Sequence, residues 1–345
     1  MKIGILTFHW SDNYGAVLQC YALQEYLKSQ GYEVDVINYA PLKYSLFYTK
    51  LLLHPTQCKK FSLTRLQKRK HQLLKQFRKV NLNLTSRIYR YHKIHHIAKQ
   101  YDVIISGSDQ VLNSSFLLYG EKGKTPVYFL PFSTPKKLGY AVSFGCLSYP
   151  EQANEYAASL VNNFDFVGVR ENSGKNILSQ LGYKNHIEIV PDPTILYGNH
   201  LYDKMTLTKE HDDYYCVYVL RSNLKLDGDD KVIYLDDNKE PVTMEQWISA
   251  IKFSKGLITN SYHGMIMAIL NHIPFCVILE HGDISGMNDR FFTLLEKIGL
   301  EDRIFSEYTS SLLSSFSIAI NWKDVDNKLD EYRKIGQTFL SQSLS

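Results

Sequence analysis

The stretch "GLITNSYHGMIMAIL", Gly256 to Leu270, joins a short apolar run to a longer one through a polar turn. "GLIT" is typical of a buried β-strand, and "MIMAIL" is typical of a buried helix. His263 and Gly264 fall where the strand passes into the helix, which is where open α/β sheets bind ligands. The stretch therefore predicts a parallel α/β sheet with a candidate site at its carboxyl edge. A helix-capping or core histidine is the competing interpretation.

The same alternation runs through the N-terminal half of the chain. The run "KIGILTF", Lys2 to Phe8, predicts a central parallel strand, and a helix and a second strand follow it. Strand and polar turn then recur in "YDVIISGSDQVLN", "KKLGYAVSFG" and "FDFVGVRENSGKNILSQLGY". Strands that alternate with helices predict βαβ units and a parallel sheet.

A second alternating series begins at "YYCVYVLR", Tyr214 to Arg221, after the proline-marked turn "VPDP", in which Asp192 is expected to form the turn. We therefore predict an α/β protein with two Rossmann-like domains that face each other across a cleft, with ligands at the carboxyl ends of the strands. The predicted boundaries are 1–197 for the N-terminal domain, with a basic helical insert at about 43–100, 198–325 for the C-terminal domain, and 326–345 for a C-terminal helix.

The composition is that of a soluble globular protein long enough for two domains. Of the 345 residues, 21% are charged and 44% hydrophobic, and no apolar run approaches the roughly 20 residues that span a bilayer. The N-terminal apolar run is too short for a secretion signal, so we expect a cytoplasmic protein. The five cysteines and twelve histidines lack disulfide or metal-ligand spacing, so no metal is predicted.

Charge is strongly segregated along the chain. Between Lys43 and Tyr101 there are fifteen Lys or Arg and no Asp or Glu, giving +15, whereas the remainder carries −11 from 24 basic and 35 acidic residues. Residues 59–80 also place leucines and a phenylalanine at helical spacing, namely Leu63, Leu66, Leu73, Leu74 and Phe77. A basic amphipathic helix of this kind fits an anionic membrane surface.

Two other interpretations of the basic segment compete, a solvated helical hairpin and a nucleic-acid-binding surface. The preceding stretch "YSLFYTKLLL", residues 44–53, adds aromatic and leucine anchors that nucleic-acid binding does not require. We therefore favour the inner face of the cytoplasmic membrane as the partner of residues 43–100 and expect no nucleic acid.

Several stretches are distinctive through their number, order and spacing, namely "DNYGAVLQCYALQEYL", "GSDQVLN", "YAVSFG", "VGVRENSG", "VPDPTILY", "TNSYHGMIMAI" followed by "IPF", and "DRFFTLLEKIGL". In these the chain resembles the polysaccharide pyruvyltransferase family over nearly its whole length. The resemblance implies a two-domain fold like that of GT-B glycosyltransferases. It also implies transfer of the enolpyruvyl group of phosphoenolpyruvate to two hydroxyls of one sugar, giving a cyclic ketal and phosphate, with no other cofactor.

In the family, the "SYHG" stretch supplies a catalytic histidine, which corresponds to His263. A histidine at a strand-to-helix junction can act as acid or base near neutral pH. The N–H groups at the start of the following helix, around Gly264, suit a phosphate. Both observations agree with the role that the resemblance implies.

The donor site departs from the family pattern. Many members have an arginine two residues before the histidine, where this sequence has Ser261, and a hydroxyl cannot replace a guanidinium on a phosphate or carboxylate. Arg290 is our candidate for the missing charge, and Arg221 is a further one. Arg170 matches a family position implicated in donor binding. A surface salt bridge is the competing interpretation for each arginine.

The acceptor sugar is expected at the first domain. His9, Asp12 and Asn13 follow the first strand, and Ser108 and Asp109 follow another strand, so all five would point toward the cleft of a parallel sheet. Helix capping is the commoner role for such Asp, Asn and Ser residues. The basic segment leads us to expect an acceptor linked to polyprenyl diphosphate at the membrane.

Two alternatives from other functional classes stay open. A GT-B sugar-nucleotide glycosyltransferase would share the fold and usually needs a carboxylate for the donor ribose, for which Glu280 is the candidate. A non-catalytic membrane- or nucleic-acid-binding protein would tolerate His263→Ala without loss of function.

Overall fold

The computed structural model describes residues 1–42, 58–121, 123–134, 136–209, 213–221, 224–226, 230–235, 241–309 and 312–345, without the side chains of residues 58–64. The chain divides into two compact units. Unit 1 comprises Met1–Leu53, Arg78–Tyr197 and Glu331–Ser345, and unit 2 comprises His54–Phe77 and Gly198–Asp330. Both units are discontinuous, because residues 54–77 group with unit 2 and residues 331–345 with unit 1. The domain boundaries predicted from the sequence are contiguous and do not assign residues 54–77 and 331–345 in this way.

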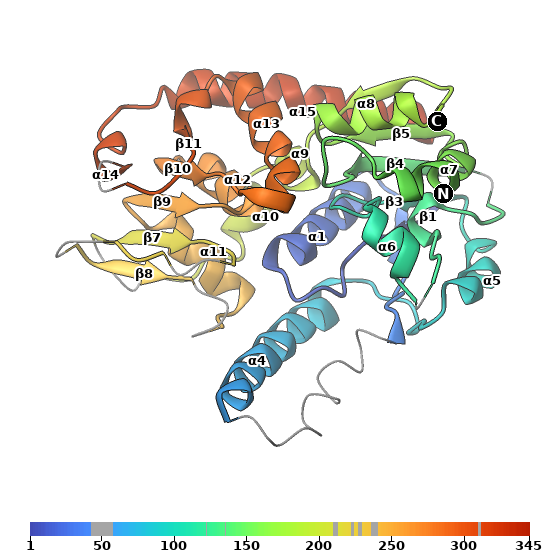
Figure 1. Ribbon diagram of the computed structural model, residues 1–345, viewed down its shortest axis with the longest axis horizontal. Coiled ribbons are helices and arrows are strands. Elements are labelled where there is room, and N and C mark those ends of the chain that lie inside the picture. The colour runs from blue at the N-terminus through green and yellow to red at the C-terminus, as the bar shows by residue number, and fades with distance from the viewer. Residues whose placement is uncertain are drawn as a thin grey trace. The chain divides into compact units, whose positions relative to one another are not determined.

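Unit 1 is built on a six-stranded parallel sheet in the order β2-β1-β3-β4-β5-β6 (Figure 1). The strands are β1 (Lys2–Leu6), β2 (Glu33–Val36), β3 (Val103–Ser106), β4 (Lys136–Val142), β5 (Phe166–Val169) and β6 (Ile187–Ile189). The helices are α1 (Tyr14–Ser29), α5 (Ile94–Ala98), α6 (Ser114–Tyr119), α7 (Glu151–Val161), α8 (Asn172–Gln180) and α9 (Pro193–Tyr197), with 3₁₀ turns η1 (Tyr91–Lys93) and η2 (Val127–Phe129). All neighbouring strands are parallel, as the apolar runs predicted.

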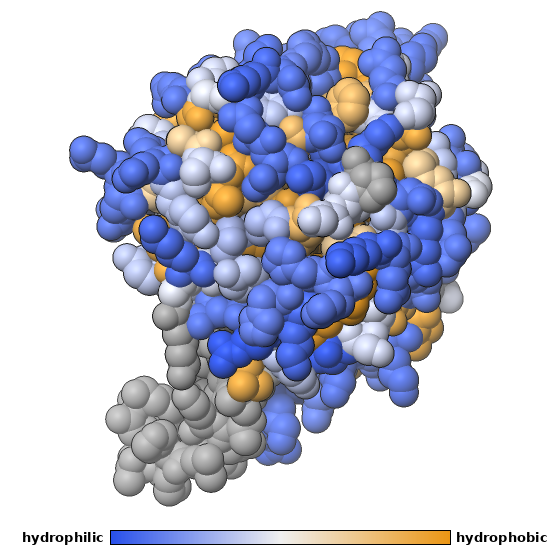
Figure 2. Space-filling model, turned by 90° about the vertical axis from the view of Figure 1, so that its right-hand side faces the viewer, coloured by the Kyte–Doolittle hydropathy of each residue, from blue (hydrophilic) through white to orange (hydrophobic). Residues whose placement is uncertain are grey.

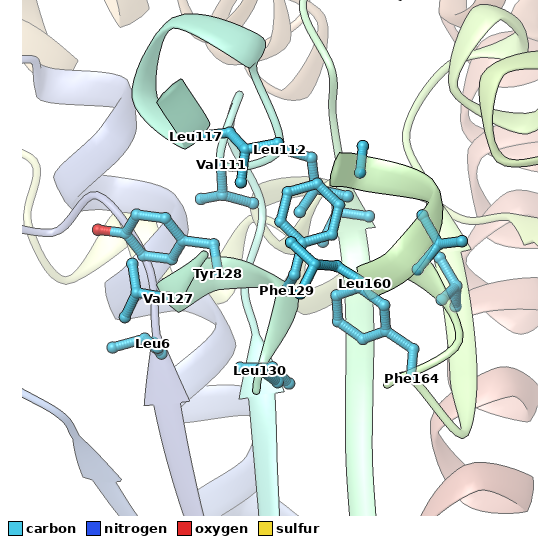
Figure 3. Close-up of a cluster of buried hydrophobic side chains, with 14 of the residues drawn as sticks. Leu6, Val111, Leu112, Leu117, Val127, Tyr128, Phe129, Leu130, Leu160 and Phe164 are labelled. Carbon is cyan, nitrogen blue, oxygen red and sulfur yellow. The ribbon is translucent and has the colours of Figure 1, made fainter. Parts of the chain in front are cut away.

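One core cluster of unit 1 combines aliphatic side chains with several aromatic rings (Figure 3). Tyr128 lies edge-on to Phe8 with ring centroids 4.9 Å apart, and Phe129 lies 6.4 Å from Phe164. Leu6 and Leu130 are fully buried in the same cluster. Edge-on and tilted ring pairs add about 0.5–1.5 kcal/mol each beyond the area they bury. This packing holds the loops that follow β1 and β3, which carry candidate site residues.

Unit 2 contains a five-stranded parallel sheet in the order β11-β10-β9-β7-β8. Its strands are β7 (Tyr215–Tyr218), β8 (Val232–Tyr234), β9 (Gly256–Thr259), β10 (Phe275–Ile278) and β11 (Ile304–Phe305). Its helices include α10 (His200–Asp203), α11 (Met244–Lys252), α12 (Tyr262–Leu270), α13 (Asp289–Ile298) and α14 (Leu312–Ser315), with 3₁₀ turns η3 (Gly282–Asn288) and η4 (Glu301–Arg303). Helix α15 (Trp322–Leu344) begins in unit 2 and ends in unit 1.

The strand and helix predicted from residues 256–270 are confirmed as β9 and α12. Every residue of β9 and of α12 is buried, which explains why this stretch lacks the alternating pattern of a half-exposed element. The prediction of two α/β domains with parallel sheets is confirmed as well.

The basic insert differs in part from its prediction as a helical segment over residues 43–100. Helix α4 covers Cys58–Asn81, and η1 and α5 make residues 91–98 helical, but residues 82–90 between them form isolated bridges with unit 1. Leu84 forms a parallel bridge with Val36, and Ile88 forms one with Tyr39. These bridges pair the last residue of β2 and the chain just after it, so part of the insert packs along the edge of this sheet. The stretch 44–53, with its aromatic and leucine residues, lies outside the described residues.

No helix in the described parts of the chain is both long and apolar enough to cross a bilayer. Figure 2 shows a face on which hydrophilic residues prevail and hydrophobic residues form small separate patches.

Candidate functional site

The first turn of α12 is fixed to the ends of β7 and β9 in unit 2. The Thr259 hydroxyl donates to the carbonyl of Tyr218 at 2.6 Å and accepts from the Ser261 N–H at 2.9 Å. Ser261 caps the helix, since its hydroxyl accepts from the Gly264 N–H at 3.3 Å. A Cβ on Gly264 would lie 2.9 Å from the Thr259 hydroxyl oxygen, so this position needs glycine for packing. The hydroxyl at the predicted donor position is thus used by the helix itself.

His263 lies in this first turn and is 6% exposed. Its ring centroid lies 5.6 Å from that of Tyr262, and Tyr262 in turn lies 6.1 Å from the ring of Phe291 in α13. The histidine is therefore positioned by a rigid, buried helix start. That is the setting expected for a preorganised catalytic group, and equally for a core histidine.

A polar network joins the loops that follow β7, β9 and β10. Asn260 exchanges two hydrogen bonds with the backbone of Leu220, at 2.6 and 2.8 Å, and donates to the Glu280 carboxylate at 3.1 Å. The same carboxylate oxygen accepts from Arg221 at 2.6 Å. Asn288 closes the network by exchanging two backbone hydrogen bonds with Glu280, at 2.8 and 3.0 Å. These hydrogen bonds link the loops at the carboxyl edge of this sheet to one another.

Arg221 and Arg290 differ in their surroundings. Arg221 has a half-exposed side chain and a φ of 62°, a left-handed conformation that costs energy in a residue with a side chain. Its charge is balanced by Glu280, whose side chain is 11% exposed. The Arg290 guanidinium carbon lies 5.7 Å from the ring centre of Tyr262 and 5.1 Å from that of Phe291. Arg290 therefore places a cation beside the first turn of α12.

The corresponding edge of unit 1 holds a buried ionic cluster. Arg170 follows β5, and its guanidinium lies 3.4 Å from Asp192 and 3.3 Å from Glu171. Ser108 donates to Asp192 at 2.7 Å. Thr194 donates to the other carboxylate oxygen of Asp192 through both its hydroxyl and its N–H, at 2.7 and 3.0 Å. The side chains of Arg170 and Asp192 are completely buried, so Arg170 makes its ionic contacts inside unit 1.

The predicted acceptor residues lie in different surroundings. His9 is 1% exposed, and its ring nitrogens face the carbonyl of Thr7 and the side-chain oxygen of Asn38 at 3.2 and 3.3 Å. Burial, assisted by the nearby charge of Arg78, lowers the pKa of His9 to about 4. His9 is therefore neutral at pH 7. It has almost no surface with which to contact a sugar.

Asp12 and Asn13 lie at the start of α1. Asn13 caps the helix by accepting from the Ala16 N–H at 3.1 Å, and Asp12 lies 3.6 Å from the guanidinium of Arg78. Ser108 is fully buried against Asp192.

Asp109 is partly exposed and has a φ of 90°. Its carboxylate accepts from the Gln110 N–H at 2.8 Å, and its carbonyl accepts from Ser143 and Val111. Asp12, Asn13 and Asp109 keep some exposed surface, whereas His9 and Ser108 do not. Within the described residues, no group of three His, Cys, Asp or Glu is placed to hold a metal ion.

Sequence reasoning missed the connecting residues of both edges. Asp192 was expected only to form a turn, but it also neutralises Arg170, and Asn260 was not singled out. The signal available in the sequence is position, because Asn260 directly follows one short apolar strand and Asp192 comes three residues after another, where parallel sheets gather polar groups.

Comparison with solved structures finds distant similarity in fold. A UDP-GlcNAc 2-epimerase from Methanocaldococcus jannaschii, in complex with UDP-GlcNAc and UDP, matches with a TM-score of 0.49 and 13% identity, covering 99% of both chains. MurG of Acinetobacter baumannii matches with a TM-score of 0.44 and 12% identity, covering 99% of this chain and 98% of that one. The glycosyltransferase SnogD of Streptomyces nogalater matches with a TM-score of 0.43 and 11% identity, covering 99% of both. Nothing about activity follows from likenesses at this level.

In sequence, none of the curated proteins compared with the chain matches it. The family model "Polysaccharide pyruvyl transferase" matches residues 13–282, which include β2 to β10, the ionic cluster of unit 1 and the first turn of α12. Because the match covers most of the chain, the protein belongs to the polysaccharide pyruvyl transferase family.

Proposed function

We propose that the protein transfers the enolpyruvyl group of phosphoenolpyruvate to two hydroxyls of a sugar in a surface-polysaccharide precursor, forming a cyclic ketal and releasing phosphate. Membership in the family supports transfer to a polysaccharide. The observation that carries the choice of site is His263, held in the buried first turn of α12 with the Arg290 guanidinium packed on the adjacent Tyr262. This arrangement provides an acid or base, a cation and helix N–H groups in one place.

The chemistry assigns distinct tasks to these groups. A proton must be added to the methylene carbon of the enol, which leaves the adjacent carbon electrophilic toward a sugar hydroxyl. That hydroxyl loses its proton as the first carbon–oxygen bond forms. The second hydroxyl then replaces phosphate at the same carbon and gives up its proton in turn. We assign proton transfer to His263, which can cycle between acid and base.

We assign the departing phosphate to Arg290 and the first turn of α12. Arg290 is favoured over Arg221, because its guanidinium packs on Tyr262, the residue next to His263, whereas Arg221 contacts the Glu280 carboxylate at 2.6 Å. An anionic donor placed at Arg221 would also face the negative charge of Glu280. Arg290 instead packs its guanidinium on the rings of Tyr262 and Phe291, which orient it beside the first turn of α12.

The contacts of Glu280 also weaken the glycosyltransferase alternative. A carboxylate that binds a donor ribose must offer its oxygens to hydroxyls, whereas one oxygen of Glu280 already accepts from both Arg221 and Asn260. We therefore keep the pyruvyltransferase as the single proposed function. In this proposal the acceptor is a sugar carried on polyprenyl diphosphate, an inference from the basic segment alone.

The test is a thermal-shift titration with phosphoenolpyruvate beside a panel of UDP-, GDP- and CMP-sugars. A ligand at about 100 times its dissociation constant adds roughly 2.7 kcal/mol of stability. Phosphoenolpyruvate should stabilise the wild type and Arg90→Ala, a control at an exposed arginine of unit 1, but not Arg290→Ala. Stabilisation by a sugar nucleotide and not by phosphoenolpyruvate would contradict the proposal. Equal stabilisation of Arg290→Ala would leave the function standing and reject the assignment of Arg290.

A further inference from the structure

The exposed face of α4 is a row of cations. Its exposed charged side chains, here called the cationic stripe, are Arg65, Lys68, Arg69, Lys75 and Lys79. They recur at helical spacing with the exposed amides of Gln72 and Gln76 between them, so they share one face. Helix α4 contains no acidic residue, so nothing on the helix itself neutralises the stripe. Like charges on one face cost energy unless an anion lies against them.

The opposite face of α4 is occupied by the protein. Leu74 is fully buried and Phe77 is 5% exposed, so these apolar side chains are not available to a bilayer. Arg78 donates to the carbonyl of Ser11 at 3.0 Å and lies 3.6 Å from Asp12. Among the described side chains of α4, Val80 is the exposed apolar one. The apolar face of the predicted amphipathic helix is therefore buried at Leu74 and Phe77.

We propose that the cationic stripe docks flat on an anionic lipid surface, by electrostatic attraction and without insertion of α4. From Arg65 to Lys79 the stripe extends over about 21 Å, at about 1.5 Å per residue. That length exceeds two Debye lengths at physiological ionic strength, about 8 Å each. The cations therefore act on a broad field of headgroups and not on one phosphate. The proposal goes beyond the proposed function and does not depend on it, since docking requires no catalysis.

The make-up of the stripe favours lipid over nucleic acid. Three of the five cations are lysines, which act as hydrated point charges and not as planar forks for base edges. None of the described side chains of α4 is an exposed aromatic ring of the kind that stacks on single-stranded bases. Electrostatic binding to an anionic lipid surface requires only a high density of basic charge, and the stripe has it.

The experiment compares co-sedimentation of the full chain with vesicles of phosphatidylcholine alone and vesicles that also contain phosphatidylglycerol. The stripe variant changes all five cations to glutamine. The control variant changes five exposed lysines elsewhere to glutamine, namely Lys175, Lys184, Lys204, Lys323 and Lys334. Both variants carry the same net charge. Thermal unfolding should be the same in both, because every substituted side chain is exposed.

The wild type and the control variant should bind only the vesicles that contain phosphatidylglycerol, and the stripe variant should lose roughly 10³-fold in partition coefficient. Binding should disappear between about 0.01 M and about 1 M salt, as the Debye length shrinks from about 30 to about 3 Å. Equal loss in both variants would overturn the stripe as the docking site. Binding that persists at high salt would show that the protein inserts into the bilayer. If the stripe bound single-stranded RNA more tightly than phosphatidylglycerol vesicles at equal phosphate concentration, nucleic acid and not lipid would be its partner.

Discussion

Removing the Asp192 carboxylate should be among the most damaging single changes in unit 1. Asp192→Ala deletes the partner 3.4 Å from Arg170, the acceptor for Ser108 and the acceptor for Thr194. The Arg170 side chain is completely buried, so water cannot replace what is lost. The guanidinium keeps the Glu171 carboxylate at 3.3 Å.

The expected loss follows from these contacts. Removing one member of a buried ion pair costs about 3–5 kcal/mol. Because the Glu171 carboxylate stays near Arg170, we expect the loss from the ion pair to lie toward the lower end of this range. Loss of the Thr194 contacts at the start of α9 adds about 1 kcal/mol. We expect the free energy of unfolding to fall by about 4 kcal/mol. Lys28→Ala, which breaks a partly exposed pair at 3.1 Å, should cost less than about 1 kcal/mol.

A fluorescence assay can isolate unit 1. Of the three tryptophans, Trp10 lies in unit 1, whereas Trp247 and Trp322 lie in unit 2 and can be replaced by phenylalanine in every variant. Urea titration of Trp10 fluorescence then reports the unfolding of unit 1. Adding Arg170→Met to Asp192→Ala should recover part of the loss, because it removes the uncompensated charge. A loss below about 1 kcal/mol for Asp192→Ala, or a double variant less stable than Asp192→Ala, would refute this reasoning.

Three further predictions concern single residues. His263→Gln should lower turnover by roughly 10²- to 10⁴-fold with unchanged thermal unfolding, whereas equal loss of soluble protein would mark a structural histidine. Because the pKa of His9 is about 4 when folded and near 6.5 when unfolded, protonation favours the unfolded chain. Stability should therefore fall by about 3 kcal/mol as the pH drops from 6.5 to 4, and His9→Asn should remove this part of the pH dependence in urea titrations. Gly145→Ala should destabilise unit 1 by more than about 1 kcal/mol in the same assay, because Gly145 has a φ of 71° and a Cβ there would lie 2.8 Å from the Gln110 side chain; an unchanged midpoint would contradict this.

The sequence predicted the α/β units because buried parallel strands are apolar runs that polar turns interrupt, a local pattern visible in residues 2–8 and 256–259. It could not predict the ionic cluster of unit 1. Asp192 is 22 residues from Arg170 and 84 from Ser108, and only the pairing order of the strands brings them together.

Composition likewise revealed that residues 59–80 form a basic amphipathic helix but not what covers its apolar side. Leu74 and Phe77 have the same helical spacing whether they face lipid or protein, and the structure shows them buried. The histidine His263 could be singled out because it stands alone between a strand and a helix. Its neighbour Arg290, twenty-seven residues further on, could be named only as one candidate among several.

The last fifteen residues described, Glu331–Ser345, have a consequence for biosynthesis, since they belong to unit 1 although they follow all of unit 2 in the chain. Phe339, Leu340 and Leu344 enter the same core cluster as Ile3, Val103 and other residues of the first sheet. A nascent chain that has emerged from the ribosome only as far as residue 330 therefore leaves this core open, even though all six strands of the sheet have been synthesised. Completion of the N-terminal sheet's core must wait for the end of α15, and during translation the apolar face that this helix covers needs protection from aggregation.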